Sequence, residues 1–319
     1  MNTVPYFDGL LRKPESVESL RQWRRHVAAA LDGLLKYGDD AFGWCMSYAE
    51  KDGRPHHQSL LGLGRHILVY LDCAKVLLAQ GCVEGCTPLL RSMLEATLGI
   101  THIAEERHEE RGLAYQFARI KRRVKKLRMG DRTSREGQNV AAELVGDVYA
   151  PYLLGKLPTD LGTRADEIER RLAAERRFDP IAAEWERLKN PPGGRPRGKD
   201  PEWYTLFSGA DQIRTWTKRM NFVSVYLFIY KDMSSEAHAG DTVQTLTTSR
   251  GMLRPLRYPH DFHGAVQLAF LWFINGFEKL TAFYDPGLGE QFRAYILGTL
   301  HPEFVELIGG LRKAFEAYK

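Results

Sequence analysis

The chain has 319 residues, of which 44% are hydrophobic and 27% charged, and its formal net charge is +5. This composition is typical of a globular protein with one large domain or about two domains. The longest strongly apolar segment, residues 265–277, is shorter than the roughly 20 residues of a membrane span, and residues 1–5 lack the features of a signal peptide, so we expect a cytoplasmic protein with no membrane partner.

Apolar residues recur at helical spacing along most of the chain. Glycines at positions 38, 81 and 130 are expected to end helices, while Thr87 is expected to cap one and Pro88 to fit its first turn. The pattern predicts helices over residues 16–36, 59–78, 87–104, 109–128, 138–149, 164–177, 180–189, 211–220, 226–240 and 263–284, and shorter ones after Pro286 and Pro302.

Strand-type alternation is nearly absent, which predicts an all-α fold: a helical bundle with long central helices and extra peripheral ones. Prolines and glycines between residues 190 and 201 mark a linker, and residues 241–258 are expected to form a loop. We expect an N-terminal helical region over residues 1–58, a core over 59–130 and 203–284, a charged insertion over 131–202, and C-terminal helices over 285–319.

Motifs for common cofactors and metals are missing from the sequence. The four cysteines, Cys45, Cys73, Cys82 and Cys86, suit reduced thiols, and neither they nor the histidines have metal-ligand spacing. The chain also has no glycine-rich phosphate loop, nucleophile elbow or dinucleotide fingerprint. We therefore expect neither a metal nor a cofactor.

A polar stripe is the most informative feature of the chain. Tyr226, Tyr230, Ser234 and His238 recur every four residues, so on a helix they share one face. Core-type residues flank this face, namely Val223, Val225, Leu227, Phe228 and Ile229. A helix that is apolar on most sides belongs in a protein interior, so the stripe is expected to be buried or to line a cleft.

The histidine of this stripe is the candidate acid or base. Gly240 is placed to end the helix, which puts His238 in the last turn, where the terminal carbonyl oxygens are expected to raise its pKa. The functional interpretation makes His238 a general acid or base with Ser234 and Glu236 around it. The structural interpretation is a histidine that satisfies helix-terminal carbonyl groups.

Arg91 and Glu95 form the second candidate, because they lie one helical turn apart in an otherwise apolar helix. Buried charges are costly unless they are paired. One interpretation is therefore a buried structural ion pair across packed helices. In the other, Arg91 binds an anion such as a phosphate while Glu95 orients a neighbouring group.

A basic run follows, with seven lysines and arginines among residues 119–128. It could contact a polyanion backbone. Four glutamates between residues 105 and 110 precede it, so the same run could instead be a solvated face that complements the helix dipole. Tyr115 and Arg119 share a face of this helix and are expected to point inward as substrate-binding residues.

With these residues identified, the chain resembles a group of bacterial helical proteins that form a domain family of unknown function. The pattern consists of an arginine and glutamate on one helix, a tryptophan, spaced tyrosines, then a serine and a histidine. Here these positions look like Arg91 and Glu95, Trp203, Tyr226 and Tyr230, and Ser234 with His238. The resemblance covers roughly residues 60–239.

The chain also has a more distant similarity to HEPN (higher eukaryotes and prokaryotes nucleotide-binding) domains, which are helical, often dimeric, and in many cases metal-independent ribonucleases. Their motif is an arginine, usually followed by a polar residue, with a histidine five to seven positions later. Lys231 and Asp232, followed by His238, resemble this motif with lysine in place of arginine. Lysine keeps the positive charge but loses the bidentate phosphate geometry, which Arg91 or Arg119 would have to supply.

The resemblance implies a HEPN-like ribonuclease of the toxin or antiphage-defence type, acting as a homodimer on RNA. His238, Lys231, Arg91, Glu95 and Ser234 would form the catalytic group, and Tyr230, Tyr226, Tyr115 and Arg119 would bind substrate. The alternative is a non-catalytic helical module that binds RNA, a nucleotide or another protein.

Overall fold

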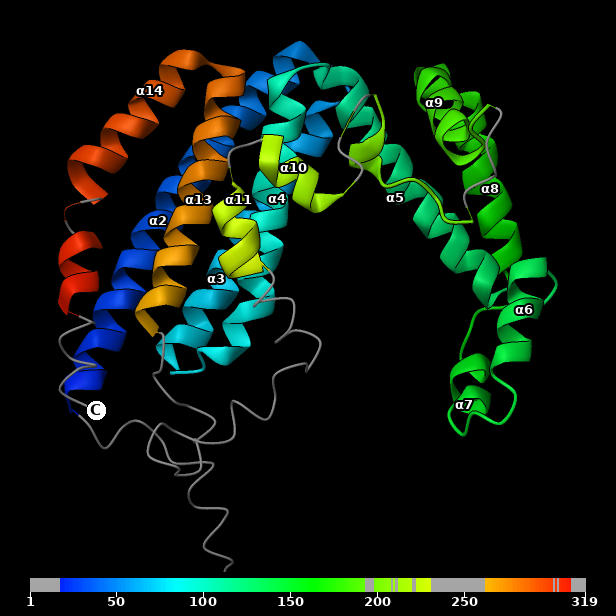
Figure 1. The fold of residues 1–319 in the computed structure, drawn as a ribbon, viewed down its shortest axis with the longest axis horizontal. Coiled ribbons are helices and arrows are strands. Elements are labelled where there is room, and N and C mark those ends of the chain that lie inside the picture. Colours follow the sequence, from blue (N-terminus) through cyan, green and yellow to red (C-terminus); the bar gives the residue numbers. More distant parts are fainter. Residues whose placement is uncertain are drawn as a thin grey trace, which may run out of the picture. The chain divides into compact units, whose positions relative to one another are not determined.

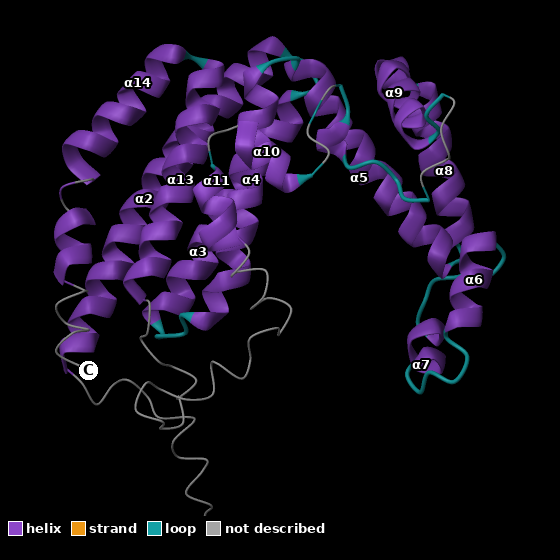
Figure 2. Cartoon of the chain, in the orientation of Figure 1, coloured by secondary structure: helices purple, strands orange, loops and turns teal. Residues whose placement is uncertain are grey.

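The computed structural model describes residues 18–192, 198–207, 209, 212–219, 222–230, 262–300, 302 and 304–310. Every regular element in these residues is helical, and Figure 2 shows helices and loops without strands. The predicted all-α helical bundle is confirmed for the described part of the chain. The expected loop over residues 241–258 lies outside the described residues.

The contacts divide the chain into two compact units. Unit 1 comprises residues 1–106 and 213–319, and unit 2 comprises residues 107–212. The helix over residues 108–130 groups with the residues that follow it, whereas the sequence predicts that it belongs to the core region of residues 59–130 and 203–284. The physical reason is that its main helical partners are the three helices and the short 3-10 turns that come after it.

Unit 1 is built around the apolar helix α13 (Phe262–Tyr284), which packs against α2 (Glu18–Asp52), α3 (His57–Ala79) and α4 (Thr87–Glu105). Figure 1 shows these helices side by side in one bundle. The buried face of α13 includes Trp272, Phe273 and Phe277, none of which is exposed to solvent. These large side chains form the centre of the unit 1 core.

The predicted stop at Gly38 is wrong, because α2 continues through this position to Asp52. A Cβ atom at Gly38 would lie 2.6 Å from Leu68 Cδ2 and 2.7 Å from Phe273 Cε2. The glycine therefore allows α2 to approach α3 and α13 closely. The helix ends where Gly53 adopts a φ of 68°, a conformation that favours glycine.

Helix α4 begins where the sequence predicts, with Pro88 in its first turn. The residue before the helix is Cys86 rather than Thr87, and its side chain makes no capping hydrogen bond, so the prediction that Thr87 caps α4 is wrong. Along α4 lie α10 (Ile213–Arg219), α11 (Val223–Val225) and the π-helix η5 (Tyr226–Tyr230). Trp216 of α10 packs edge-on against His102 of α4, with ring centroids 5.4 Å apart.

The C-terminal part of unit 1 contains short helical elements, as predicted. Helix α14 (Pro286–Tyr295) packs on α13, and the π-helix η6 (Ile296–Leu300) and helical residues 304–310 follow it. Asp285 caps α14 by accepting a hydrogen bond from the Gly287 amide at 2.8 Å. The Tyr48 hydroxyl also donates to the Asp285 carboxylate, which links α2 to the start of α14.

Unit 2 surrounds α5 (His108–Gly130), whose Phe117 ring lies 5.5 Å from that of Trp185 and 6.0 Å from that of Phe178. The prediction of a single helix over residues 138–149 is wrong. The chain leaves the helix after Glu143, Gly146 adopts a φ of 89°, and a new helix begins at Ala150 with Pro151 in its first turn. The elements that follow α5 are α6 (Arg135–Glu143), α7 (Ala150–Gly155), α8 (Leu161–Ala174), η3 (Arg176–Phe178), α9 (Asp179–Lys189) and η4 (Trp203–Thr205).

None of the helices in the described residues combines the length and apolar character that crossing a bilayer requires. The four cysteines are free thiols, with Cys45 and Cys86 buried.

Candidate functional site

Arg91, Glu95 and Tyr230 meet in a closed triangle of hydrogen bonds, which we call the Arg91 cluster. Arg91 Nε donates to Glu95 Oε1 at 3.1 Å, and Arg91 Nη2 donates to the Tyr230 hydroxyl at 3.0 Å. The Tyr230 hydroxyl in turn donates to Glu95 Oε1 at 3.1 Å. The guanidinium carbon also lies 4.8 Å from the centre of the Tyr230 ring. The fold thus joins two predicted site residues of α4 to a third from η5.

The burial of the Arg91 cluster differs from the expectation of a buried ion pair. The Arg91 side chain is 23% exposed and that of Glu95 is 44% exposed, whereas Tyr230 is 7% exposed. The pair lies on a part of α4 that the bundle does not cover, so water reaches both charges. An ion pair of this kind contributes at most about 1 kcal/mol to stability, and its groups remain accessible to a ligand.

The electrostatics of the cluster keep the arginine charged and the tyrosine neutral. Burial by itself lowers the pKa of Arg91, but its contacts with Tyr230 and Glu95 outweigh this, and the pKa is raised. Burial raises the pKa of Tyr230, the Glu95 carboxylate raises it further, and the Arg91 guanidinium partly opposes this rise. The cluster therefore presents one cation, one carboxylate and a neutral hydroxyl.

The two tyrosines of the predicted stripe are neighbours in space. The rings of Tyr226 and Tyr230 are stacked, with centroids 5.5 Å apart and an angle of 18° between their planes. The sequence predicts that the polar stripe is buried or lines a cleft. Of its two described members, Tyr230 is buried and Tyr226 is half-buried, and the described flanking residues Val223, Val225, Leu227 and Ile229 are half-buried.

Residues 57–249, more than half of the chain, match the protein family described as "Family of unknown function (DUF5677)". The chain belongs to DUF5677. The matched region contains the whole Arg91 cluster and the expected positions of the stripe. This match confirms the resemblance to a domain family of unknown function. No curated protein and no solved structure matches the chain.

Five residues of the candidate motifs lie outside the described residues: Lys231, Asp232, Ser234, Glu236 and His238. Their place relative to the Arg91 cluster stays a prediction. Tyr230 is the last described residue before them, so the described structure reaches the beginning of the candidate motif.

Tyr115 and Arg119 of the DUF5677 region belong to unit 2. Tyr115 is half-buried and packs edge-on against Trp203, with ring centroids 5.1 Å apart. The Arg119 guanidinium lies 5.8 Å from the centre of the Tyr115 ring, and Arg119 is exposed. The prediction that Arg119 points inward is wrong, because the buried face of α5 is formed by residues such as Phe117 and Ala118.

The basic run of α5 is partly neutralised within unit 2. Arg122 forms an ion pair with Glu202, Lys125 with Asp200 at 3.5 Å, and Arg128 with both Asp166 and Glu169. These contacts hold α5 to the elements after it, which is a structural role for part of the run.

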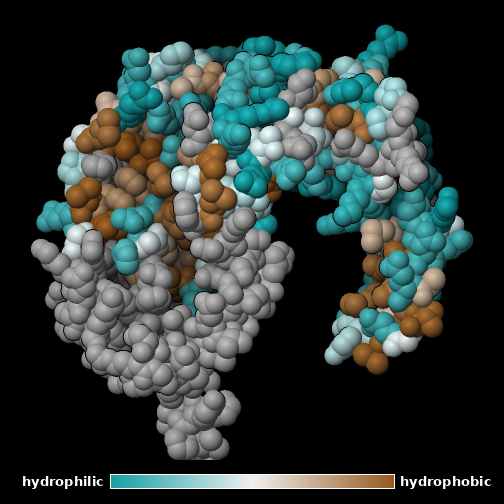
Figure 3. Space-filling view, in the orientation of Figure 1, coloured by the Kyte–Doolittle hydropathy of each residue, from teal (hydrophilic) through white to brown (hydrophobic). Residues whose placement is uncertain are grey.

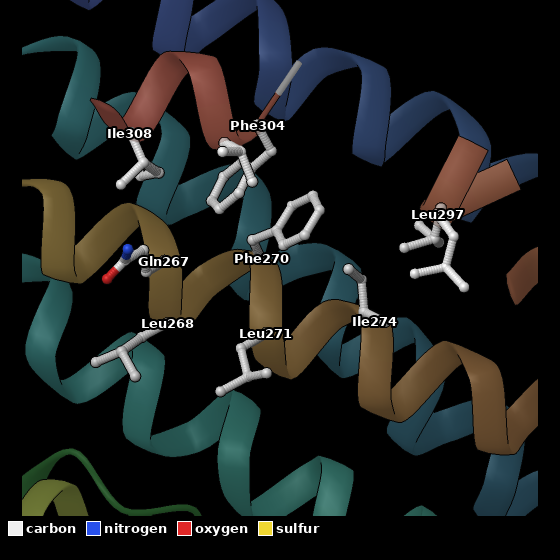
Figure 4. Close-up of a pocket in the computed structure, with 10 residues that line it drawn as sticks. Gln267, Leu268, Phe270, Leu271, Ile274, Leu297, Phe304 and Ile308 are labelled. Atoms are coloured by element: carbon white, nitrogen blue, oxygen red, sulfur yellow. The ribbon is translucent and has the colours of Figure 1, made fainter. Parts of the chain in front are cut away.

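An apolar cavity of about 610 Å³ lies between α13 and the C-terminal elements of unit 1. Figure 4 shows Leu271 and Ile274 of α13 and Leu297 of η6 among its lining residues. The Phe270 and Phe304 rings stack in its wall, with centroids 3.7 Å apart. The sequence does not predict this cavity, and its residues lie beyond the region that matches DUF5677. The only sequence signal was the strongly apolar character of residues 265–277.

Other ionisable residues in unit 1 have a structural role. The buried His57 places Nε2 2.5 Å from Asp52 Oδ2, and Arg54 Nε lies 2.7 Å from the same oxygen, which joins the end of α2 to the start of α3. Among the described residues, no group of three or more histidine, cysteine, aspartate or glutamate side chains could hold a metal ion.

Replacing Tyr230 with phenylalanine is expected to lower the stability of the DUF5677 fold by about 1 kcal/mol, because the hydroxyl joins Arg91 to Glu95. The pKa of Tyr230 is raised in the folded protein, so its contribution is complete below the ordinary tyrosine pKa of about 10 and is lost as the pH rises above it. Thermal unfolding of both proteins at neutral pH and above pH 10 measures this difference.

The matched control is Tyr226→Phe, because the structure assigns the Tyr226 hydroxyl no hydrogen bond to the described residues. This variant should unfold at the wild-type temperature. Equal destabilisation by the two substitutions would mean that the hydroxyl of Tyr230 does not hold the cluster together.

Proposed function

We propose that the protein is a metal-independent endoribonuclease with a HEPN-like helical core. The observation that supports this most directly is the Arg91 cluster, in which a partly exposed guanidinium and a carboxylate of α4 meet a tyrosine of η5. A guanidinium suits a phosphate group, and the half-buried Tyr226 beside the cluster offers a ring face to a base. The acidic Glu95 can orient a ribose hydroxyl or a neighbouring side chain.

In this proposal, His238 is the acid or base of the reaction. The 2′-hydroxyl of RNA loses its proton to a base and attacks the adjacent phosphorus, while the bond from phosphorus to the 5′-oxygen breaks and that oxygen takes up a proton. Lys231 and Arg91 stabilise the negative charge that develops on the phosphoryl oxygens, and Ser234 assists as a hydrogen-bonding group. The products carry a 2′,3′-cyclic phosphate and a 5′-hydroxyl. The route uses no metal ion.

The biological setting belongs to the same proposal. The enzyme would act in the cytoplasm of a bacterium as a toxin or antiphage-defence nuclease, and it would work as a homodimer. Tyr115 and Arg119 would bind the RNA substrate, because Arg119 is exposed and lies beside an aromatic ring.

The test is to incubate the purified protein with RNA in the presence of EDTA and to identify the ends of the products. Cleavage with 2′,3′-cyclic phosphate ends is expected for the wild type and not for His238→Ala. Expression of the wild type should also slow cell growth, whereas expression of His238→Ala should not. Intact RNA together with equal growth of the two strains would remove the support for a nuclease.

A non-catalytic nucleotide- or RNA-binding module is the second candidate. The observation that favours it is that Glu95 and Tyr230 already occupy two nitrogens of the Arg91 guanidinium, as in a structural or recognition cluster. A thermal-shift screen with nucleotides and short RNAs tests this function. Stabilisation by a ligand without RNA cleavage would favour binding alone, and no shift with any ligand would contradict it.

A further inference from the structure

The outer face of α5 carries a row of exposed basic side chains, which we call the α5 stripe. It consists of Arg119, Arg123 and Lys126, which recur at intervals of four and three residues. At this spacing the three side chains share one face of the helix, opposite the buried Phe117 and Val124. The stripe spans about 10 Å along the helix axis.

Three other basic residues of α5 are neutralised, whereas the α5 stripe is not. Arg122, Lys125 and Arg128 form ion pairs with acidic residues that follow α5 in the chain. Within the part of the chain that the structure describes, none of the stripe residues has an acidic partner. Residues 111–130 contain eight lysines and arginines and no aspartate or glutamate. The ion pairs therefore hold one side of α5 and leave the positive charge of the stripe exposed.

The helix dipole does not account for the α5 stripe. Its favourable effect on basic residues is confined to the last turn of a helix. Helix α5 ends at Gly130, so Arg119 and Arg123 lie eleven and seven residues before its end. Arg128 is in the last turn, and its charge is already matched by two acidic residues. The dipole therefore explains a basic residue at the end of α5 but not a stripe that starts about three turns earlier.

The positive charge of the chain is concentrated in the unit that carries the α5 stripe. Unit 2, residues 107–212, contains 22 lysines and arginines and 17 aspartates and glutamates, so its net charge is +5 with histidine neutral. Unit 1 contains 23 of each and has no net charge. A charge of one sign over one unit attracts polyanions and raises their association rate. This charge complementarity indicates a polyanion as the partner of unit 2.

The side chains around the α5 stripe favour RNA over an anionic membrane. Two of the three stripe residues are arginines, whose planar guanidinium forms paired hydrogen bonds with phosphate oxygens. The half-buried Tyr115 ring lies 5.8 Å from the Arg119 guanidinium, and an aromatic ring beside a basic row is typical of single-strand recognition.

Helix α5 lacks the apolar surface of a membrane-binding helix. Such a helix exposes large apolar side chains that enter the lipid. All of α5 is described by the structure, and Met129 is the one large apolar side chain that it exposes. The surface along α5 in the view of Figure 3 is mainly hydrophilic. A nucleic acid therefore fits this face better than a bilayer does.

We propose that the α5 stripe binds the sugar-phosphate backbone of single-stranded RNA, with the Tyr115 ring available to a base. This role rests on the proposed nuclease function, which makes RNA the substrate, and it adds Arg123 and Lys126 to the residues that hold the strand. Over about 10 Å the stripe reaches about three successive phosphates of one strand. Backbone contacts carry no sequence information, so the stripe holds RNA of any sequence.

The first experiment measures the binding of a fluorescent 2′-O-methyl RNA to the full-length protein by anisotropy at several salt concentrations. The methyl group blocks the nucleophile of the proposed reaction, so binding is measured without cleavage. Each phosphate contact with a single strand contributes about 0.7 to the slope of log K against log salt. The triple variant Arg119→Gln, Arg123→Gln, Lys126→Gln is expected to lose about 2 units of this slope and to bind at least about 10-fold more weakly at about 0.1 M salt.

The matched control is the triple variant Arg164→Gln, Arg171→Gln, Arg177→Gln. It removes the same positive charge from unit 2, but each of these exposed arginines already has an acidic partner close by in the sequence. This variant should keep the wild-type slope. The double variant Arg119→Lys, Arg123→Lys keeps the charge of the stripe and should also keep the slope. Circular dichroism checks that each variant is folded.

Equal losses of binding in the two triple variants would overturn the inference, because the net charge of unit 2 and not the stripe would then hold the RNA. A wild type that binds no RNA would overturn it too, and binding to phosphatidylserine vesicles in its place would make a membrane the partner. The cleavage assay separates the two proposals. RNA that is bound through the stripe and left uncut contradicts the nuclease alone, whereas RNA that is cut by a protein whose stripe variant binds normally contradicts the stripe alone.

Discussion

Replacing Arg91 with alanine is expected to lower kcat/KM for RNA cleavage by about 100- to 1,000-fold, the usual effect of removing one group that stabilises charge in the transition state. The guanidinium is partly exposed and held by Tyr230 and Glu95, so it is oriented before a ligand arrives. Arg91→Lys should retain part of the activity, because lysine keeps the charge and loses the forked geometry. Initial rates with a fluorescent RNA measure both effects.

Loss of folding is not expected to explain this result. Glu95 is 44% exposed in its side chain, so water can solvate its carboxylate when Arg91 is removed. Arg65→Ala is the control, because Arg65 is an exposed arginine of α3 in the same unit. The Arg65 variant should cleave at the wild-type rate. If the two alanine variants cleaved RNA equally well, Arg91 would have no part in the reaction.

Local sequence signals predicted the main helices well. Helices α3, α4, α5 and α13 lie within a few residues of their expected ranges, because their apolar spacing and their boundary residues act locally. Gly38 shows where such signals fail. A glycine can end a helix or allow a close approach between helices, and only the positions of Leu68 and Phe273 distinguish these roles.

In the candidate site too, some features follow from the local sequence and others depend on tertiary structure. The pairing of Arg91 with Glu95 follows from helical spacing, so it could be predicted from the sequence. Their exposure could not, because it depends on which parts of α4 the bundle covers. The hydrogen bonds that Tyr230 accepts from Arg91 and donates to Glu95 join residues more than 130 positions apart, and the apolar cavity is formed by three segments, so both depend on tertiary structure. The placement of His238 remains a prediction.

Replacing Trp272 with alanine is expected to destabilise the protein by about 3–5 kcal/mol, the usual loss when a large buried aromatic side chain leaves a cavity. Trp272 has no exposed surface and lies on α13, where three bundle helices meet. Its carbonyl oxygen accepts a hydrogen bond at 3.0 Å from the hydroxyl of Thr97 on α4. Urea unfolding followed by circular dichroism gives the change in the free energy of unfolding.

Trp44→Ala is the matched control, because Trp44 is 42% exposed on α2 and should lose at most about 1 kcal/mol. Trp272 also supports α4, the helix that carries Arg91 and Glu95, since α13 and α4 form one of the main packing contacts of unit 1. The Trp272 variant should therefore lose RNA cleavage at a lower urea concentration than the Trp44 variant. Equal unfolding midpoints would show that α13 is not the centre of the core and that the Arg91 cluster is held by other contacts.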